Sequence, residues 1–132
     1  MKLYGKNNRD YLIILNNLAL TYFYDGNYSK SLELYQKVSE LTEIKFGKNY
    51  ELYYKSIQNI SMIYSNIGDY SKSLELDQFA IEITHNMYDE IHPDFLNLLN
   101  NQGLHYMDNG NISKAIDLFK KVIEITYVNY GE

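Results

Sequence analysis

The residue types that could carry out a reaction are few in this sequence, and their spacing matches no catalytic or metal site. The three histidines, His85, His92 and His105, lack the paired spacing on one helix face that a zinc site requires. We expect them at helix ends or on the surface. The absence of cysteine excludes disulfides, thiolate metal sites and a cysteine nucleophile. The sequence therefore predicts neither an enzyme nor a bound metal or other cofactor.

A different chemistry, hydrogen bonding by side-chain amides, recurs at a fixed interval. Asn17, Asn59 and Asn101 follow one another at a spacing of 42 residues. Asn is a mediocre helix former, so its recurrence inside predicted helices calls for a compensating use. A carboxamide both donates and accepts hydrogen bonds, which suits gripping the backbone of an extended peptide. The same amides could instead bridge adjacent helices and stabilise their packing, and the sequence leaves both interpretations open.

The interval of 42 residues holds along the whole chain. The segment GNYSKSLEL at 26–34 returns as GDYSKSLEL at 68–76 and as GNISKAIDL at 110–118. A fixed period of this size is typical of solenoids, in which each unit buries its apolar face only against its neighbours. We expect one domain over residues 1–132, with repeat units at 5–46, 47–88 and 89–130.

Each unit has the apolar spacing of two helices joined by a short turn. In the first unit Leu15, Leu18 and Tyr22 follow steps of three and four, which places them along one helix face. Gly26, and glycines at the two equivalent positions, can take the left-handed conformation that ends a helix. Ser29, with its counterparts Ser71 and Ser113, is predicted to cap the second helix of its unit.

The segments NNLALTY at 16–22 and DGNY at 25–28 resemble the tetratricopeptide repeat, in the long variety found in kinesin light chains and many signalling proteins. His92-Pro93-Asp94 strengthens the resemblance, because that variety often begins its first helix with His-Pro. The resemblance covers essentially the whole chain. It implies an all-α fold, a right-handed α-solenoid of three tandem helix-turn-helix hairpins, with close helix crossings at Ala19, Ser61 and Gly103.

One position departs from the family pattern. Tyr35 and Phe119 are aromatic, but the equivalent residue of the middle unit is Asp77. Either Asp77 lies at an open edge or the packing around it differs. Phe79 would then belong to a rearranged core or, alternatively, would form an exposed contact for a partner.

In tetratricopeptide arrays the first helices of successive hairpins line a concave groove. The resemblance therefore implies a binding surface for a protein or peptide on those helices. Only Lys55 would add a cation there, which disfavours a clamp for a terminal carboxylate. The implied groove residues are Ile13, Asn16, Asn17, Leu20, Tyr24, Lys55, Gln58, Asn59, Met62, Asn66, Asn97, Asn100, Asn101, Leu104 and Asp108, with Phe23, Ser65 and Met107 beside them.

The charge balance limits the kinds of partner. The formal net charge is −5, and Lys and Arg form no cluster, so we expect no binding to nucleic acid or to an anionic membrane surface. No apolar run approaches the roughly 18 to 20 residues of a membrane span, and we expect a cytoplasmic protein. The acidic excess lies in the second and third units, where it could steer a basic partner or form a solvated outer face.

Three functional hypotheses follow. The first, which we prefer, is a peptide-receptor module that binds through the concave groove. The second is a scaffold that forms homo-oligomers through its terminal helices, because Ile116, Phe119, Val122 and Ile123 would be left partly uncovered where the sequence stops before a fourth unit. The third is a fragment of a larger tetratricopeptide signalling protein whose output domain lies elsewhere in its sequence.

Overall fold

The computed structural model describes residues 9–130, and over this range the chain is all-helical. The helices are α1 (Arg9–Tyr24), α2 (Tyr28–Phe46), α3 (Glu51–Asn66), α4 (Tyr70–Met87), α5 (Pro93–Asp108) and α6 (Ile112–Tyr130). Each pair that is joined by a short turn forms a hairpin, and each hairpin packs against the next. The prediction of an all-α solenoid of helical hairpins is confirmed.

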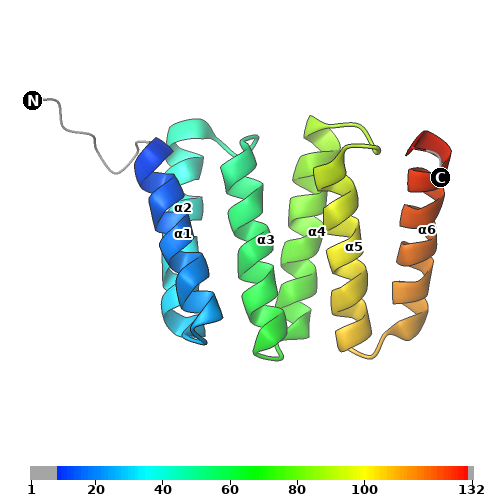
Figure 1. Ribbon diagram of the computed structural model, residues 1–132, viewed down its shortest axis with the longest axis horizontal. Helices are drawn as coiled ribbons and strands as arrows, with labels where there is room; N and C mark the ends of the chain where they lie inside the picture. Colours follow the sequence, from blue (N-terminus) through cyan, green and yellow to red (C-terminus); the bar gives the residue numbers. More distant parts are fainter. Residues whose placement is uncertain (1–8, 131–132) are drawn as a thin grey trace, which may run out of the picture.

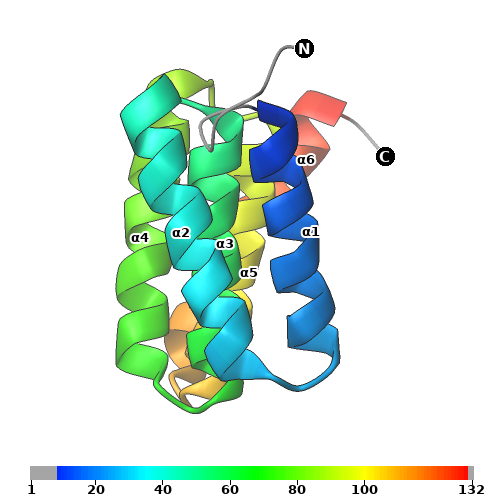
Figure 2. The same cartoon turned by 90° about the vertical axis from the view of Figure 1, so that its left-hand side faces the viewer.

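The helices follow one another along the long axis of the molecule (Figure 1). Seen from the side of α1, α2 and α4 lie toward one side of the molecule and α1, α3 and α5 toward the other, with α6 behind α1 (Figure 2). In the described part of the chain, contacts between helices that are not consecutive are sparse, and the main ones join α3 to α5. The first helices of the three hairpins therefore share one face of the molecule.

The turns within the hairpins follow the sequence prediction at the glycines but not at the serines. Gly26, Gly68 and Gly110 have φ angles of 83°, 88° and 86°, which a residue with a side chain rarely adopts. The second helices are capped by Asn27, Asp69 and Asn111, whose side-chain oxygens accept hydrogen bonds from backbone N–H groups three residues later. The predicted caps Ser29, Ser71 and Ser113 were wrong, because they lie two residues farther on, inside the first helical turn.

The small residues predicted at the helix crossings are buried there. Ala19 and Ser61 are completely buried, and a Cβ atom on Gly103 would lie 2.7 Å from the ring of Phe119. Among residues 9–130 the core forms two clusters, one around Tyr35 and Ile63 and the other around the contacts of α3, α4 and α5. Close approach at the crossings therefore depends on side chains no larger than that of serine.

Phe79 belongs to the core, as the first of its two alternatives proposed. It is half-buried against the α3–α4–α5 cluster, and its ring meets that of Tyr53 edge to face at a centroid distance of 6.4 Å. The Lys48 ammonium lies 5.6 Å from the centre of the Phe79 ring. These contacts pack the buried part of Phe79 against the core.

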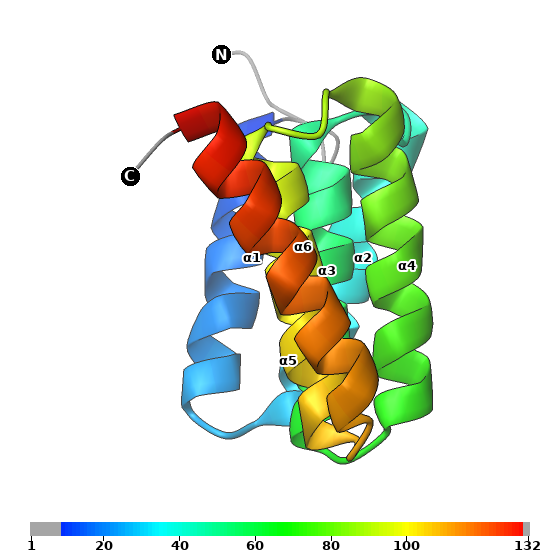
Figure 3. The ribbon, with the colours of Figure 1, turned by 90° about the vertical axis from the view of Figure 1, so that its right-hand side faces the viewer.

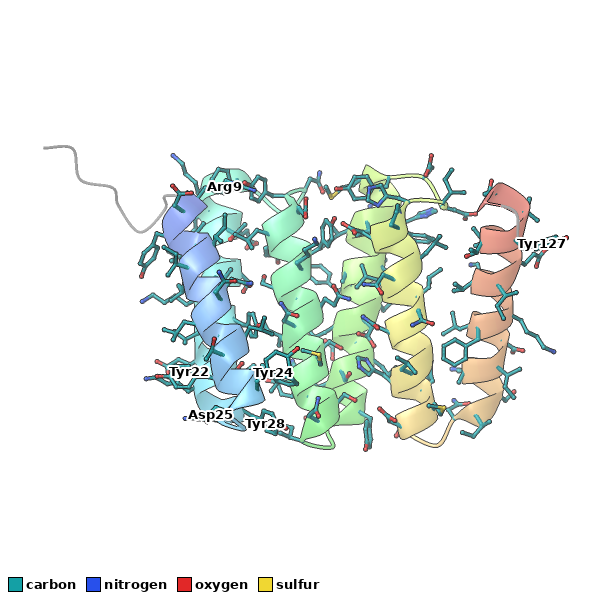
Figure 4. All side chains as sticks on the ribbon, in the orientation of Figure 1. Arg9, Tyr22, Tyr24, Asp25, Tyr28 and Tyr127 are labelled. Carbon is teal, nitrogen blue, oxygen red and sulfur yellow. The ribbon has the colours of Figure 1, made fainter. Side chains whose placement is uncertain are left out.

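The two ends of the solenoid are not covered by further helices in the described structure. Viewed from the C-terminal side, α6 is the nearest helix (Figure 3), and Tyr127 projects away from the other helices (Figure 4). Ile123 is 66% exposed, whereas Ile81, its equivalent in α4, is 7% exposed. No helix within residues 9–130 combines the length and the apolar character that crossing a membrane would need.

Candidate partner-binding site

The first helices α3 and α5 enclose a depression of 340 Å³, which we call the α3–α5 pocket. Four side-chain amides line it, together with two apolar side chains and three other polar ones. Seven of the fifteen predicted groove residues lie in it, and Ser65, predicted to lie beside the groove, is an eighth lining residue. The lining comprises Gln58, Asn59, Met62, Ser65, Asn66, Asn101, Leu104, His105 and Asp108.

The amides of the α3–α5 pocket are positioned by the repeat itself. Asn59 and Asn101 occupy equivalent places in α3 and α5, and both are half-buried at the mouth between the two helices. The amide nitrogen of Asn66 donates to the carbonyl of Met62 at 2.8 Å, which holds that side chain against its own helix. Since amides offer donors and acceptors together, the pocket can pair with both polar groups of a peptide bond.

A smaller depression of 250 Å³ lies where α1 and α3 begin, and it brings together two more predicted residues, Ile13 and Lys55. Arg9 and Tyr50 close one side through a hydrogen bond of 2.7 Å from Arg9 Nε to the Tyr50 hydroxyl. Lys55 pairs with Glu51 at 2.7 Å. The Glu51 carboxylate raises the pKa of the Lys55 ammonium, and partial burial opposes the shift.

The other predicted groove residues lie outside both depressions. Asn17 is exposed, so the three recurring amides are not equivalent in the folded chain. Asn16 is half-buried, and its Oδ1 atom is buried without a hydrogen-bond partner, while Leu20 packs on the cluster around Tyr35. The remaining members of this group, also outside the pockets, are Tyr24, Asn97 and Asn100.

Sequence reasoning missed the contacts of His105, which was expected at a helix end or on the surface: it does lie in the last turn of α5, but its side chain is buried in a polar network. Its Nδ1 atom lies 2.6 Å from Asp77 Oδ2, and Ser61 donates to Asp77 Oδ1 at 2.5 Å. Ser73 Oγ is 3.1 Å from the same His105 nitrogen. Asp77 is completely buried, so it does not lie at an open edge. The other predicted alternative, a different packing around Asp77, is the one that the structure shows.

The signal for this network was present in the sequence. A carboxylate in place of a core aromatic needs a partner, because burying an unpaired charge is costly. His105 stands at the position that Ile63 occupies one repeat earlier, so it could have been recognised as that partner. The network was missed because each histidine was assessed alone.

Serine, histidine and aspartate meet here, but not in the geometry of a nucleophilic triad. In such a triad the carboxylate and the hydroxyl contact opposite nitrogens of the imidazole ring. Asp77 and Ser73 both approach Nδ1 of His105, and Ser61 donates to the carboxylate. The arrangement joins three helices and does not activate a nucleophile. Within residues 9–130, no group of three histidines or carboxylates is placed to hold a metal ion.

A larger depression of 600 Å³ lies on the side of α4 and α6, and none of the predicted groove residues lines it. Its floor contains Gln102, whose amide donates to Gln78 at 3.1 Å. Glu82, Glu90 and Lys121 lie around it, so its charges have both signs. Three amides line it, those of Gln78, Asn86 and Gln102, but no two of them occupy equivalent positions of the repeat, as Asn59 and Asn101 do in the α3–α5 pocket.

Comparison with known proteins agrees with this architecture. The tetratricopeptide repeat family matches residues 10–86 and, in a second form of the repeat, residues 96–129. No curated protein matches the sequence significantly.

Solved structures share the fold at low sequence identity. One structure of the nearly identical TPR-like repeats of a kinesin light chain-like protein from Podosopora anserina has a TM-score of 0.86 at 19% identity, over 98% of this chain and 61% of that one. BtubC (BKLC) from P. vanneervenii has a TM-score of 0.86 at 18% identity, over 96% of this chain and 51% of that one. The chain thus spans between half and two thirds of the length of these structures. The 42-residue repeats have the kinesin-light-chain-like form, and the chain belongs to the tetratricopeptide repeat family, whose members generally mediate interactions between proteins.

Proposed function

We propose that the chain is a peptide-receptor module that holds an extended segment of a partner protein across α3 and α5. The observation that carries the proposal is the α3–α5 pocket, in which amides from two repeats stand beside the apolar side chains of Met62 and Leu104. Amides can satisfy the backbone of a bound strand whatever its sequence, and the apolar side chains favour particular side chains of the partner. Met62 can adapt to several shapes.

The test is a selection from a random linear peptide library displayed on phage. The purified chain is compared with Asn59→Ala/Asn101→Ala, which alters the pocket, and with Asn17→Ala/Asn97→Ala, a matched control outside it. We expect the parent and the control to enrich one shared motif. The pocket variant should bind that peptide about 10-fold more weakly, since two hydrogen bonds of about 0.5 to 1.5 kcal/mol each are lost.

Circular dichroism of all three proteins checks that helicity is unchanged. If no peptide is enriched by the parent, the proposal is wrong. If the control variant loses binding as much as the pocket variant does, the binding surface lies elsewhere on the first helices.

A second function, self-association from end to end, is favoured by the exposed faces of α1 and α6. Thr42 and Thr84 are completely buried, yet the equivalent Thr126 is exposed in α6. At the other end Ile14 is 67% exposed, whereas its equivalents Ser56 and Leu98 are buried. The exposed face of α6 thus corresponds to the faces of α2 and α4 that pack against the next first helix. The exposed face of α1 corresponds to the faces of α3 and α5 that pack against the preceding second helix.

Two variants test the stacking. Ile123→Glu should block the α6 face and Ile14→Glu the α1 face, so each variant alone should be monomeric in analytical ultracentrifugation. Mixed together they should form a dimer and nothing larger, because each retains one intact face. A parent chain that stays monomeric at every concentration would contradict stacking without affecting the peptide-receptor proposal.

A further inference from the structure

The α3–α5 pocket contains one carboxylate, that of Asp108, to which no described residue supplies a cation. Asp108 closes the pocket at the end of α5, and its nearest hydrogen-bond partner is the Ser65 hydroxyl at 3.5 Å. Within residues 9–130, no lysine or arginine forms an ion pair with Asp108. Its charge is therefore available to a ligand.

Helix stability does not account for a negative charge at this position. Asp108 is the last residue of α5, where the carboxyl-terminal end of the helix carries partial negative charge and disfavours a carboxylate. The equivalent residues of the other first helices, Tyr24 and Asn66, are neutral. The middle and last hairpins, which form the pocket, also hold the acidic excess of the chain.

The neighbours of Asp108 suit a long cationic side chain. Met62 and Leu104 present apolar surface on which a methylene stem can lie, and the amide oxygens of Asn66 and Asn101 can accept further N–H bonds. The pocket's 340 Å³ is at the small end of the range for ligand sites, about 300 to 1,000 Å³, and suits a single side chain.

His105 also lines the pocket, and the Asp77 carboxylate lies directly behind it, with Oδ2 2.6 Å from His105 Nδ1. Asp77 is completely buried, so it is the partner of this imidazole and leaves no unpaired cation in the pocket lining. Among the described lining residues, Asp108 is the carboxylate that remains open to a ligand.

We propose that the α3–α5 pocket recognises a lysine or arginine side chain of the bound peptide, through charge pairing with Asp108 and packing of its stem on Met62 and Leu104. This inference rests on the proposed peptide-receptor function and specifies the class of partner: a segment with a basic residue at one fixed position.

The experiment repeats the peptide selection with the parent, with Asp108→Lys and with Asp117→Lys. Asp117 lies exposed on α6 outside the pocket, so Asp117→Lys makes the same change in net charge elsewhere. We expect the parent and Asp117→Lys to enrich Lys or Arg at one position. Asp108→Lys should lose this preference and favour Asp or Glu there.

Affinities of single peptides complete the test. For the parent, replacing the basic residue by norleucine should weaken binding about 10-fold, whereas for Asp108→Asn the same replacement should have little effect. An enriched motif without a basic residue would overturn the inference and leave the peptide-receptor function standing. Absence of any enriched motif would overturn both, and equal effects of Asp108→Lys and Asp117→Lys would show general electrostatic attraction and overturn the inference as well.

Discussion

Two helix crossings of this solenoid occupy equivalent places and are built from different chemistry. At the first, Ala19, Tyr35 and Ile63 form part of an apolar cluster. At the second, 42 residues later, the same three positions hold Ser61, Asp77 and His105, which form a hydrogen-bonded network. The backbone runs the same course through both. The repeat thus tolerates either an apolar or a polar centre, provided that the three residues match one another.

The largest loss of stability is expected from removing one member of the hydrogen-bonded network at the second crossing. Asp77→Ala leaves His105 and Ser61 without their common partner in a buried place, and losing one partner of a buried pair costs about 3 to 5 kcal/mol. Urea denaturation monitored by circular dichroism measures the loss. Asp117→Ala is the matched control, because its carboxylate is exposed, and its stability should change by less than about 0.5 kcal/mol. A similar small change for Asp77→Ala would contradict the role of the network.

The difference between the two crossings can be tested by placing the residue types of the first crossing at the three positions of the second. The triple variant Ser61→Ala, Asp77→Tyr and His105→Ile should fold with at least about the stability of the parent, because a matched apolar set often replaces a buried ion pair without cost. Residues around the site support the exchange, since Tyr70, Leu74 and Leu76 repeat the types found at 28, 32 and 34. Asp77→Tyr alone should be much less stable than the triple variant. If the two are equally unstable, the crossings are not interchangeable.

The third crossing provides a smaller test, because there the small residue is Gly103 and the large one is Phe119. Gly103→Ala would place a Cβ atom 2.7 Å from the Phe119 ring. The ring can move, since α6 is open on its far side, and alanine favours a helix over glycine. We therefore expect a net loss of only about 1 kcal/mol. In the Phe119→Leu background, Gly103→Ala should cost much less stability than it does in the parent when both are measured by the same denaturation assay. An equal cost in the two backgrounds would argue against the proposed clash.

How much of this was predictable from the sequence differs between fold and site. The 42-residue period and the glycines at 26, 68 and 110 were sufficient to predict three hairpins, because both signals are local and repeat. The network was not predicted, since the partner of Asp77 comes from the next hairpin. The separation of Asn17 from the other recurring amides also depends on which helices lie beside each other. Whether the predicted groove residues bind a partner is a question for the peptide selection.

The smallest change in stability is expected for a substitution at the first crossing, measured at neutral pH. The Tyr35 hydroxyl is buried without a hydrogen-bond partner, so Tyr35→Phe should leave stability within about 0.5 kcal/mol of the parent at neutral pH. Burial raises the pKa of Tyr35 to about 12, with a further contribution from Tyr24.

The sign of the pH effect follows from that shift. The folded state favours the protonated phenol, so the parent should lose stability as the pH rises from about 10, the ordinary tyrosine pKa, towards 12. Tyr35→Phe should reduce this loss when urea midpoints are compared at pH 8 and pH 11. An identical pH dependence in the two proteins would assign the effect to other buried tyrosines, such as Tyr54, whose pKa is also raised by burial and by its contacts with Asp94 and Tyr88.

The nearly exclusive packing of each helix on its neighbours in sequence has a consequence for how the chain moves and folds. Because native contacts are mostly local along the chain, the ordering entropy needed to form any one hairpin is small, and folding should be fast for a protein of this length. Local opening should begin at the ends and progress inward one helix at a time. Amide hydrogens of α6 should therefore exchange with solvent first, and those of α3 and α4, which have neighbours on both sides, should exchange last.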